Sequence, residues 1–149
     1  MGYGERITQR LDPVSNSWPY AVGQGCLGLE CRMEDSATQE LVSFLDDAPA
    51  RAQCQAERAF LRHLEGGCQV AVGVVSENVA GGEVKLSGSV WNENGSVCET
   101  AEAQGGSAVV GKALAAALTA QAEANGNGQV ISRVADPLRR ALPVTEGAI

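Results

Sequence analysis

Three strand-like runs separated by turn sequences are the feature that most constrains the fold of this chain. The runs are predicted at residues 69–76, 83–91 and 96–103. Their connections contain Ala80-Gly81-Gly82 and Asn94-Gly95, and paired glycines and Asn-Gly are typical of hairpin turns. We therefore expect an antiparallel meander of three strands.

One face of that sheet is apolar. In the second run Val84, Leu86 and Val90 alternate with Lys85 and Ser87. Because successive residues of a strand point to opposite faces, the apolar side chains share one face and need cover.

Two predicted helices supply this cover, at residues 50–64 and about 108–124. The second is rich in alanine, and we expect Val109, Leu114 and Leu118 to contact the sheet. The fold class that follows is α+β, with a three-stranded antiparallel sheet covered by helices on one face.

The first helix has an apolar arc at about 100° per residue. His63 lies within this arc. A lone histidine in such a place is typically a satisfied, partly buried side chain rather than a catalyst. The arc consists of Ala52, Ala56, Ala59, Phe60 and Leu64.

The same helix carries a basic stripe of Arg51, Arg58 and Arg62 to one side of the arc. Two interpretations remain open: a solvated face, or a face that meets carboxylates of a ligand or of another domain. Arg58 is the residue we favour for the second. Glu57 and Glu65 are expected to pair with arginines or to cap the helix.

The helix runs directly into Gly66-Gly67-Cys68. Glycines can take the left-handed conformation that ends a helix, and they allow a ligand to approach the backbone. Cys68 is thus either an accessible attachment point or a small buried packing residue.

The chain before this helix is irregular at first, because Asp12-Pro13 and Trp18-Pro19 interrupt regular structure. Residues 20–32 follow as a glycine-interrupted apolar run, which we interpret as a loop leading into a buried strand. Gly23, Gly25 and Gly28 have the spacing GxGxxG. A dinucleotide fingerprint must follow a strand and open a helix, so we reject that function here.

A helix is expected at residues 36–45, with Ser36 as its N-cap. Its predicted apolar face consists of Ala37, Leu41, Phe44 and Leu45. Asp46-Asp47-Ala48-Pro49 then starts the main domain, because proline suits the first turn of a helix. Beyond residue 128 we expect a short helix from about residue 130 to 135 and a tail.

Composition excludes several classes of function. The net charge of −7, with only 11 basic residues, argues against nucleic acid or an anionic membrane as a partner. No apolar run approaches the roughly 20 residues of a membrane span. Five cysteines without a CxxC pair, and a single histidine, predict no metal site and free thiols in a reducing compartment.

Two longer motifs resemble one family. The run AERAFLRHLEGGCQV and the run AVGQGCLGLE are similar to signatures of the porphobilinogen deaminases, also called hydroxymethylbilane synthases. The resemblance implies that Cys68 holds a dipyrromethane cofactor through a thioether, beside Gly67. It also implies that further residues face the cofactor and the substrate carboxylates, namely Gly23, Gln24, Gly25 and Arg58.

The resemblance also implies a domain division. Residues 1–20 would be the tail of a second domain and residues 21–47 a return segment of the first, both fragments of periplasmic-binding-protein-like α/β domains. Residues 48–149 would be the C-terminal cofactor-attachment domain. The family's catalytic aspartate has no counterpart here, so we expect no catalytic residue in this chain, which resembles a truncated form, inactive alone.

The implied activity condenses four porphobilinogen units, with loss of ammonia, on the primer. The expected partners are porphobilinogen and oligopyrrole intermediates. We expect a monomer that needs the N-terminal half of the family's chain. The expected compartment is the cytoplasm, or a plastid if a transit peptide exists. Two alternatives stay open: a nonenzymatic tetrapyrrole-binding or interaction module, and a thiol redox protein using Cys68 with Cys26. Cys26 itself departs from the family pattern, which has alanine there.

Overall fold

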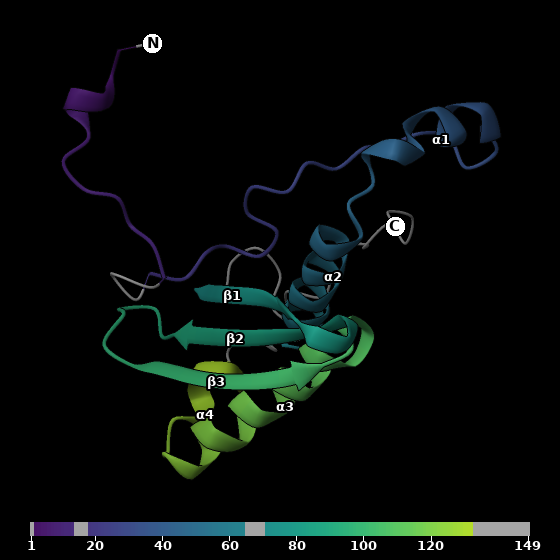
Figure 1. Ribbon diagram of the computed structural model, residues 1–149. Coiled ribbons are helices and arrows are strands. Elements are labelled where there is room, and N and C mark those ends of the chain that lie inside the picture. Colours follow the sequence, from purple (N-terminus) through teal and green to yellow (C-terminus); the bar gives the residue numbers. More distant parts are fainter. Residues whose placement is uncertain (1, 14–17, 65–70, 133–149) are drawn as a thin grey trace.

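The computed structural model describes residues 2–13, 18–64 and 71–132. Its centre is an antiparallel sheet in the order β1-β2-β3 (Figure 1), formed by Val72–Val79, Glu83–Trp91 and Cys98–Gly105. The predicted meander is confirmed. The bounds of β2 agree with the prediction, whereas β1 and β3 continue past residues 76 and 103 to Val79 and Gly105.

Glycines make both connections in this sheet. Gly81 and Gly82 have φ of +82° and +76°, and Gly95 has φ of +70°. Residues with side chains rarely adopt these values. The tight turn between β1 and β2 allows Val79 to pair with Glu83 immediately beside it.

The alternation predicted for β2 holds along its whole length. Val84, Leu86 and Val90 are fully buried, whereas Lys85 and Ser87 on the other face are only partly buried. The sheet therefore has one face packed on a core and one open face.

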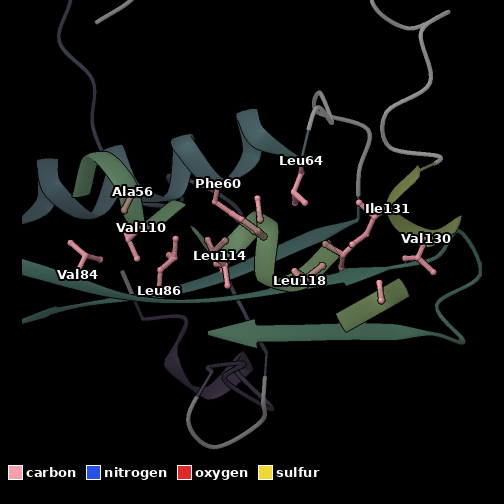
Figure 2. Close-up of a cluster of buried hydrophobic side chains, with 14 residues drawn as sticks. Ala56, Phe60, Leu64, Val84, Leu86, Val110, Leu114, Leu118, Val130 and Ile131 are labelled. Carbon is pink, nitrogen blue, oxygen red and sulfur yellow. The ribbon is translucent and has the colours of Figure 1, made fainter. Parts of the chain in front are cut away.

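Two helices cover the packed face: α2, Ala48–His63, and α3, Ser107–Ala124 (Figure 2). Asp47 caps α2, since its Oδ1 accepts from the Ala50 amide at 2.8 Å, and Pro49 lies in the first turn. The short helix α4, Gly128–Ser132, follows α3 and adds the buried side chains of Val130 and Ile131.

One expected contact of α3 is wrong. Val109 is 63% exposed, whereas its neighbour Val110 is 1% exposed. The stripe that faces the core begins at Val110 and continues four residues apart through Leu114 and Leu118, the spacing that keeps side chains on one helical face.

Two glycines allow the layers to pack closely, because they have no side chain. A Cβ at Gly111 of α3 would collide with the backbone of α2 at Ala56 and Phe60. A Cβ at Gly88 of β2 would lie 2.6 Å from Cζ of Phe60. Phe60 is therefore enclosed between both helices and the sheet, and burial of such a side chain stabilises by about 1.5–3 kcal/mol.

The helix predicted at residues 36–45 is shorter than expected. Helix α1, Ser36–Val42, is followed by a 3₁₀ turn, Ser43–Leu45. Its N-cap is Asp35 rather than Ser36, because the Asp35 carboxylate accepts from both the amide and the hydroxyl of Thr38. Aspartate is the stronger acceptor and holds two bonds at once.

Helix α1, with its predicted apolar face, lies apart from the sheet (Figure 1). Leu41 and Phe44 are 71% and 79% exposed. The described part of the chain thus provides no surface against which this face packs.

The strand expected within residues 20–32 does not form. Only Tyr20 pairs, in an isolated antiparallel bridge with Val74, and Leu27 is 97% exposed. A strand needs a neighbour for its backbone groups, and the described residues offer these positions none beyond Tyr20. A further 3₁₀ turn, Gly4–Arg6, lies near the start of the chain.

Candidate functional site

Helix α2 positions the candidate site. It ends at His63 with Leu64 as its C-cap, and the sequence Gly66-Gly67-Cys68 comes shortly after it in the chain. Gly67 and Cys68, the attachment point implied by resemblance, lie outside the described residues. The described geometry of the site therefore comes from α2 and from the turn at residues 21–26.

That turn is a compact double turn. The amide of Gln24 donates to the Ala21 carbonyl at 3.0 Å, and the amide of Cys26 donates to the Gly23 carbonyl at 3.1 Å. Gly23 and Gly25 have φ of +69° and +85°. The positive φ values explain the glycines, and the turn is a preformed backbone structure.

Glu57 of α2 holds the turn in place. Its Oε2 accepts from the Gly23 amide at 2.7 Å, and its Oε1 accepts from the Ser76 hydroxyl at 2.5 Å. The expectation that Glu57 pairs with an arginine or caps the helix is wrong, because these two donors, from the turn and from β1, occupy both carboxylate oxygens. One carboxylate thus joins the turn, α2 and β1.

The turn keeps hydrogen-bonding capacity for a ligand. The Gln24 side-chain Oε1 accepts from the Ala21 amide at 2.9 Å, which leaves its Nε2 without a partner among the described residues. The amide of Gly25 likewise has no acceptor in that part of the chain. Space is open here, since a Cβ at Gly23 or Gly25 would meet no atom within 4 Å.

The arginines of α2 differ in their surroundings. Arg51 pairs with Asp46 at 3.2 Å, and both side chains are about half exposed. Arg58 is exposed and makes no ion pair with any described residue. Arg51 thus fits the interpretation of the basic stripe as a solvated face. The guanidinium of Arg58 is available to an anionic ligand.

His63 is more exposed than expected for a residue of the apolar arc. Its Nδ1 lies 2.7 Å from the carbonyl oxygen of Ala59, one turn earlier. The side chain is satisfied by its own helix, as expected.

Two cysteines that sequence reasoning did not connect lie together in this region. The Cys54 thiol of α2 donates to Sγ of Cys26 in the turn, with 2.8 Å between the sulfur atoms. Burial, the hydrogen bond with Cys26 and the nearby Cys26 and Glu57 charges raise the pKa of Cys54 to about 11, partly offset by Arg58. Cys54 and Glu57 are three residues apart and share one helical face. The contact between Cys54 and Cys26 could therefore be predicted only from the knowledge that Glu57 binds Gly23 in the turn.

The open face of the sheet carries a separate hollow of about 410 Å³. Trp91, at the end of β2, is among the residues that line it. The ring of Pro19 covers Gly73, where a Cβ would collide with it. The hollow is lined by Pro13, Pro19, Val75, Ser87, Ser89, Trp91, Cys98 and Thr100.

Metal-binding clusters and membrane-spanning helices are both absent from the part of the chain that the structure describes. Nowhere in residues 2–13, 18–64 and 71–132 do three His, Cys, Asp or Glu side chains gather closely enough to hold a metal ion. No helix in the same ranges has both the length and the apolar character needed to cross a bilayer.

An open-faced antiparallel sheet with two helices on its packed face defines a small α+β domain. Residues 51–120 match the family model described as the C-terminal domain of porphobilinogen deaminase. These residues belong to the porphobilinogen deaminase family through that domain.

Curated relatives agree with this assignment. The chain is 41% identical over 134 residues to porphobilinogen deaminase of Synechococcus elongatus, covering 90% of this chain and 41% of the relative. The corresponding enzyme of Desulforudis audaxviator is 40% identical over 134 residues, covering 90% and 42%. Porphobilinogen deaminase of Prochlorococcus marinus is 45% identical over 95 residues, which cover 64% of this chain and 29% of the relative. The chain thus spans less than half the length of these relatives.

Proposed function

We propose that this chain supplies the cofactor-attachment domain of a hydroxymethylbilane synthase. The enzyme condenses four porphobilinogen units, with loss of ammonia from each, on a dipyrromethane primer joined by a thioether to Cys68. The observation that carries the proposal is the family match over residues 51–120, which include most of α2 and Cys68. In tetrapyrrole biosynthesis this is a transferase reaction.

The chemistry of the described groups fits such a primer. Bound, the primer would supply the terminal pyrrole to which each new ring is added, and its rings carry carboxylate side chains. Arg58 offers a guanidinium that makes no ion pair with any described residue, and such a group is suited to carboxylates. The Gly25 amide and the Gln24 side-chain amide add neutral donors beside open space. The Gly23 amide, in contrast, is committed to Glu57, so we assign Gly23 a role in shaping the turn.

General acid and base catalysis is not assigned to Glu57. Both of its oxygens accept hydrogen bonds within the fold, so its role is to hold the turn. We propose that this chain alone does not consume porphobilinogen, because none of its residues corresponds to the family's catalytic aspartate. Residues 1–20 and 21–47 would then belong to the family's other two domains, and residues 48–149 would form the attachment domain of a monomer.

Exposed apolar side chains before α2 support the need for further domains. Leu29, Met33, Leu41 and Phe44 are all more than half exposed. Burial of such groups against another domain would remove apolar surface from water at about 25 cal/mol per Å². This observation also favours the alternative of an interaction module, which would hold a pyrrole without releasing product.

The first test is an intact-mass spectrum of the purified chain after incubation with preformed hydroxymethylbilane. We expect a pyrrole-based adduct that is absent from Cys68→Ser and retained in the control Cys31→Ser, whose cysteine is exposed and remote from α2 in sequence. Arg58→Ala should lower the yield of adduct, whereas Arg62→Ala, on the same basic stripe, serves as the matched control.

Two results would contradict the proposal. An adduct that persists in Cys68→Ser would place the cofactor elsewhere, and its absence from a folded wild-type chain would leave no attachment site. Consumption of porphobilinogen by the chain alone would overturn the statement that it is inactive. Addition of the N-terminal domains of a relative distinguishes an enzyme component, which gains product release, from a binding module, which does not.

A further inference from the structure

Two thiols from separate segments meet beside the turn at residues 21–26. Cys54 Sγ and Cys26 Sγ are 2.8 Å apart, and a disulfide bond measures about 2.05 Å. A closing movement of less than about 1 Å would therefore bring the two sulfurs to bonding distance. Cys26 is exposed and Cys54 is half-buried, so a reagent from solvent reaches Cys26 first.

The backbone around the pair is already held in place. Gly23 donates to Glu57, which lies one turn of α2 after Cys54. Cys26 donates to the carbonyl of Gly23, and Tyr20 bridges to Val74 just before the turn. Both segments are therefore held beside each other, and thiols held in this way react as an intramolecular pair.

We propose that Cys26 and Cys54 are a redox-modification site, forming a reversible disulfide that fastens the turn at residues 21–26 to α2. This inference is independent of the proposed function. Cys31 and Cys98 are exposed, and among the described residues neither has a thiol neighbour. The pairing is thus specific to two of the four described cysteines.

The chemistry needs an oxidant, which we take to be a low-molecular-weight disulfide. The Cys26 thiolate attacks one sulfur of that reagent, forming a mixed disulfide and releasing one small thiol. Cys54 then loses its proton to solvent and attacks Cys26 Sγ, forming the intramolecular bond and releasing the second small thiol. Two protein thiols lose two electrons in total, and the reagent is reduced to two thiols.

The state of Cys54 sets the order of the two steps. Burial and the neighbouring Cys26 raise the pKa of Cys54 to about 11, so at neutral pH it stays a thiol and does not react with the reagent directly. In a reducing compartment such a bond is transient and responds to the redox poise.

The test treats the full 149-residue chain with oxidised glutathione, followed by peptide mapping without reduction. We expect a peptide pair joined through Cys26 and Cys54, with loss of two hydrogens from the intact mass and full reversal by a dithiol. Hydrogen exchange at the amides of residues 21–26 should slow in the oxidised form. Cys68→Ser, run in parallel, removes the fifth cysteine, which lies outside the described residues, as a competing partner.

Matched variants distinguish oxidation of the Cys26–Cys54 pair from general oxidation of the thiols. Cys54→Ser should stop at a stable glutathione adduct on Cys26, because the second thiol is missing. Cys31→Ser should still form the bond, and Cys26→Ala should lose the redox dependence of exchange at residues 21–26. A dominant cross-link to Cys31 or Cys68, or a lasting glutathione adduct on Cys26 in the wild-type chain, would overturn the proposal.

Discussion

Asn127 donates its side-chain amide to the carboxylate of Glu99 at 2.6 Å, and this contact ties the turn after α3 to strand β3. Asn125 donates to the other oxygen of the same carboxylate at 2.9 Å. Glu99 is only 3% exposed, on the packed face of the sheet. A charged group is thus held beside an apolar core by two neutral amides, an arrangement that resists protonation.

The first prediction concerns pH. The hydrogen bonds from Asn127 and Asn125 lower the pKa of Glu99 from its ordinary value of 4.5. A lowered folded-state pKa contributes stability that is fully present above 4.5 and is lost as the pH falls through the folded-state value. We expect Glu99→Gln to lower the urea midpoint at pH 7 and to flatten its fall in acid. Glu93→Gln, in the exposed turn before β3, should show the wild-type profile; equal acid profiles for all three proteins would contradict the assignment.

The second prediction concerns Glu57→Gln. A glutamine is uncharged and has one oxygen and one NH₂ group, so it replaces two hydrogen bonds to a carboxylate by weaker neutral ones and keeps an acceptor at only one of the two positions. We expect a loss of up to about 1.5–3 kcal/mol in the free energy of unfolding, the range for hydrogen bonds to charged groups. Exchange of the Gly23 amide should also accelerate. Urea unfolding and hydrogen exchange are the measurements, with Glu77→Gln on the exposed end of β1 as control, and an unchanged Gly23 rate would refute the role of this carboxylate.

The third prediction concerns Gly88→Ala. The added methyl group would lie 2.6 Å from Phe60 Cζ and 3.0 Å from Leu114 Cδ2. Overpacking of this kind costs about 1–3 kcal/mol in the free energy of unfolding. Gly28→Ala, where a Cβ meets nothing within 4 Å, should be close to neutral in the same urea titration.

A second variant tests the mechanism at Gly88. Phe60→Leu shortens the side chain that the new methyl group meets, so Gly88→Ala should cost less in the Phe60→Leu background than in the wild type. Additive losses would show that the two positions do not contact each other as described.

The fourth prediction concerns the reduced Cys54 thiol. With a pKa of about 11, only about one Cys54 in a thousand is a thiolate at pH 8. We expect its alkylation by iodoacetamide to be about tenfold or more slower than that of a free cysteine, even after allowing for the higher nucleophilicity of a more basic thiolate. The rate, followed by mass spectrometry, should keep rising steeply from pH 8 to pH 10. Levelling near pH 9 would contradict the raised pKa.

The elements that sequence reasoning predicted well are those whose signals are local. The alternation around Leu86, the Asn94-Gly95 turn and the periodicity around Phe60 each lie within a few residues, and all three appear in the structure. Asp35 was missed as a cap because Ser36 is also a good N-cap residue. Only the geometry of Thr38 distinguishes the two.

Long-range partners were beyond the reach of local patterns. Glu57 meets Gly23 across 34 positions, and Cys54 meets Cys26 across 28. No periodicity encodes such pairs. The strand expected after Tyr20 failed for a related reason, because strand formation depends on a neighbour that local sequence does not reveal. Arg58, Gln24 and Gly25 remain predictions as cofactor contacts, and Cys68 and Gly67 lie outside the described residues.

The bridge between Tyr20 and Val74 has a consequence for behaviour at high concentration. Strand β1 lies at the edge of the sheet, and unpaired edges invite pairing with the edge of another molecule. Tyr20 occupies the middle of that edge with two backbone hydrogen bonds. Pro19, lacking an amide hydrogen, prevents the pairing from continuing. A single pair of backbone hydrogen bonds, preceded in the chain by a proline, thus blocks this part of the edge from pairing with another copy.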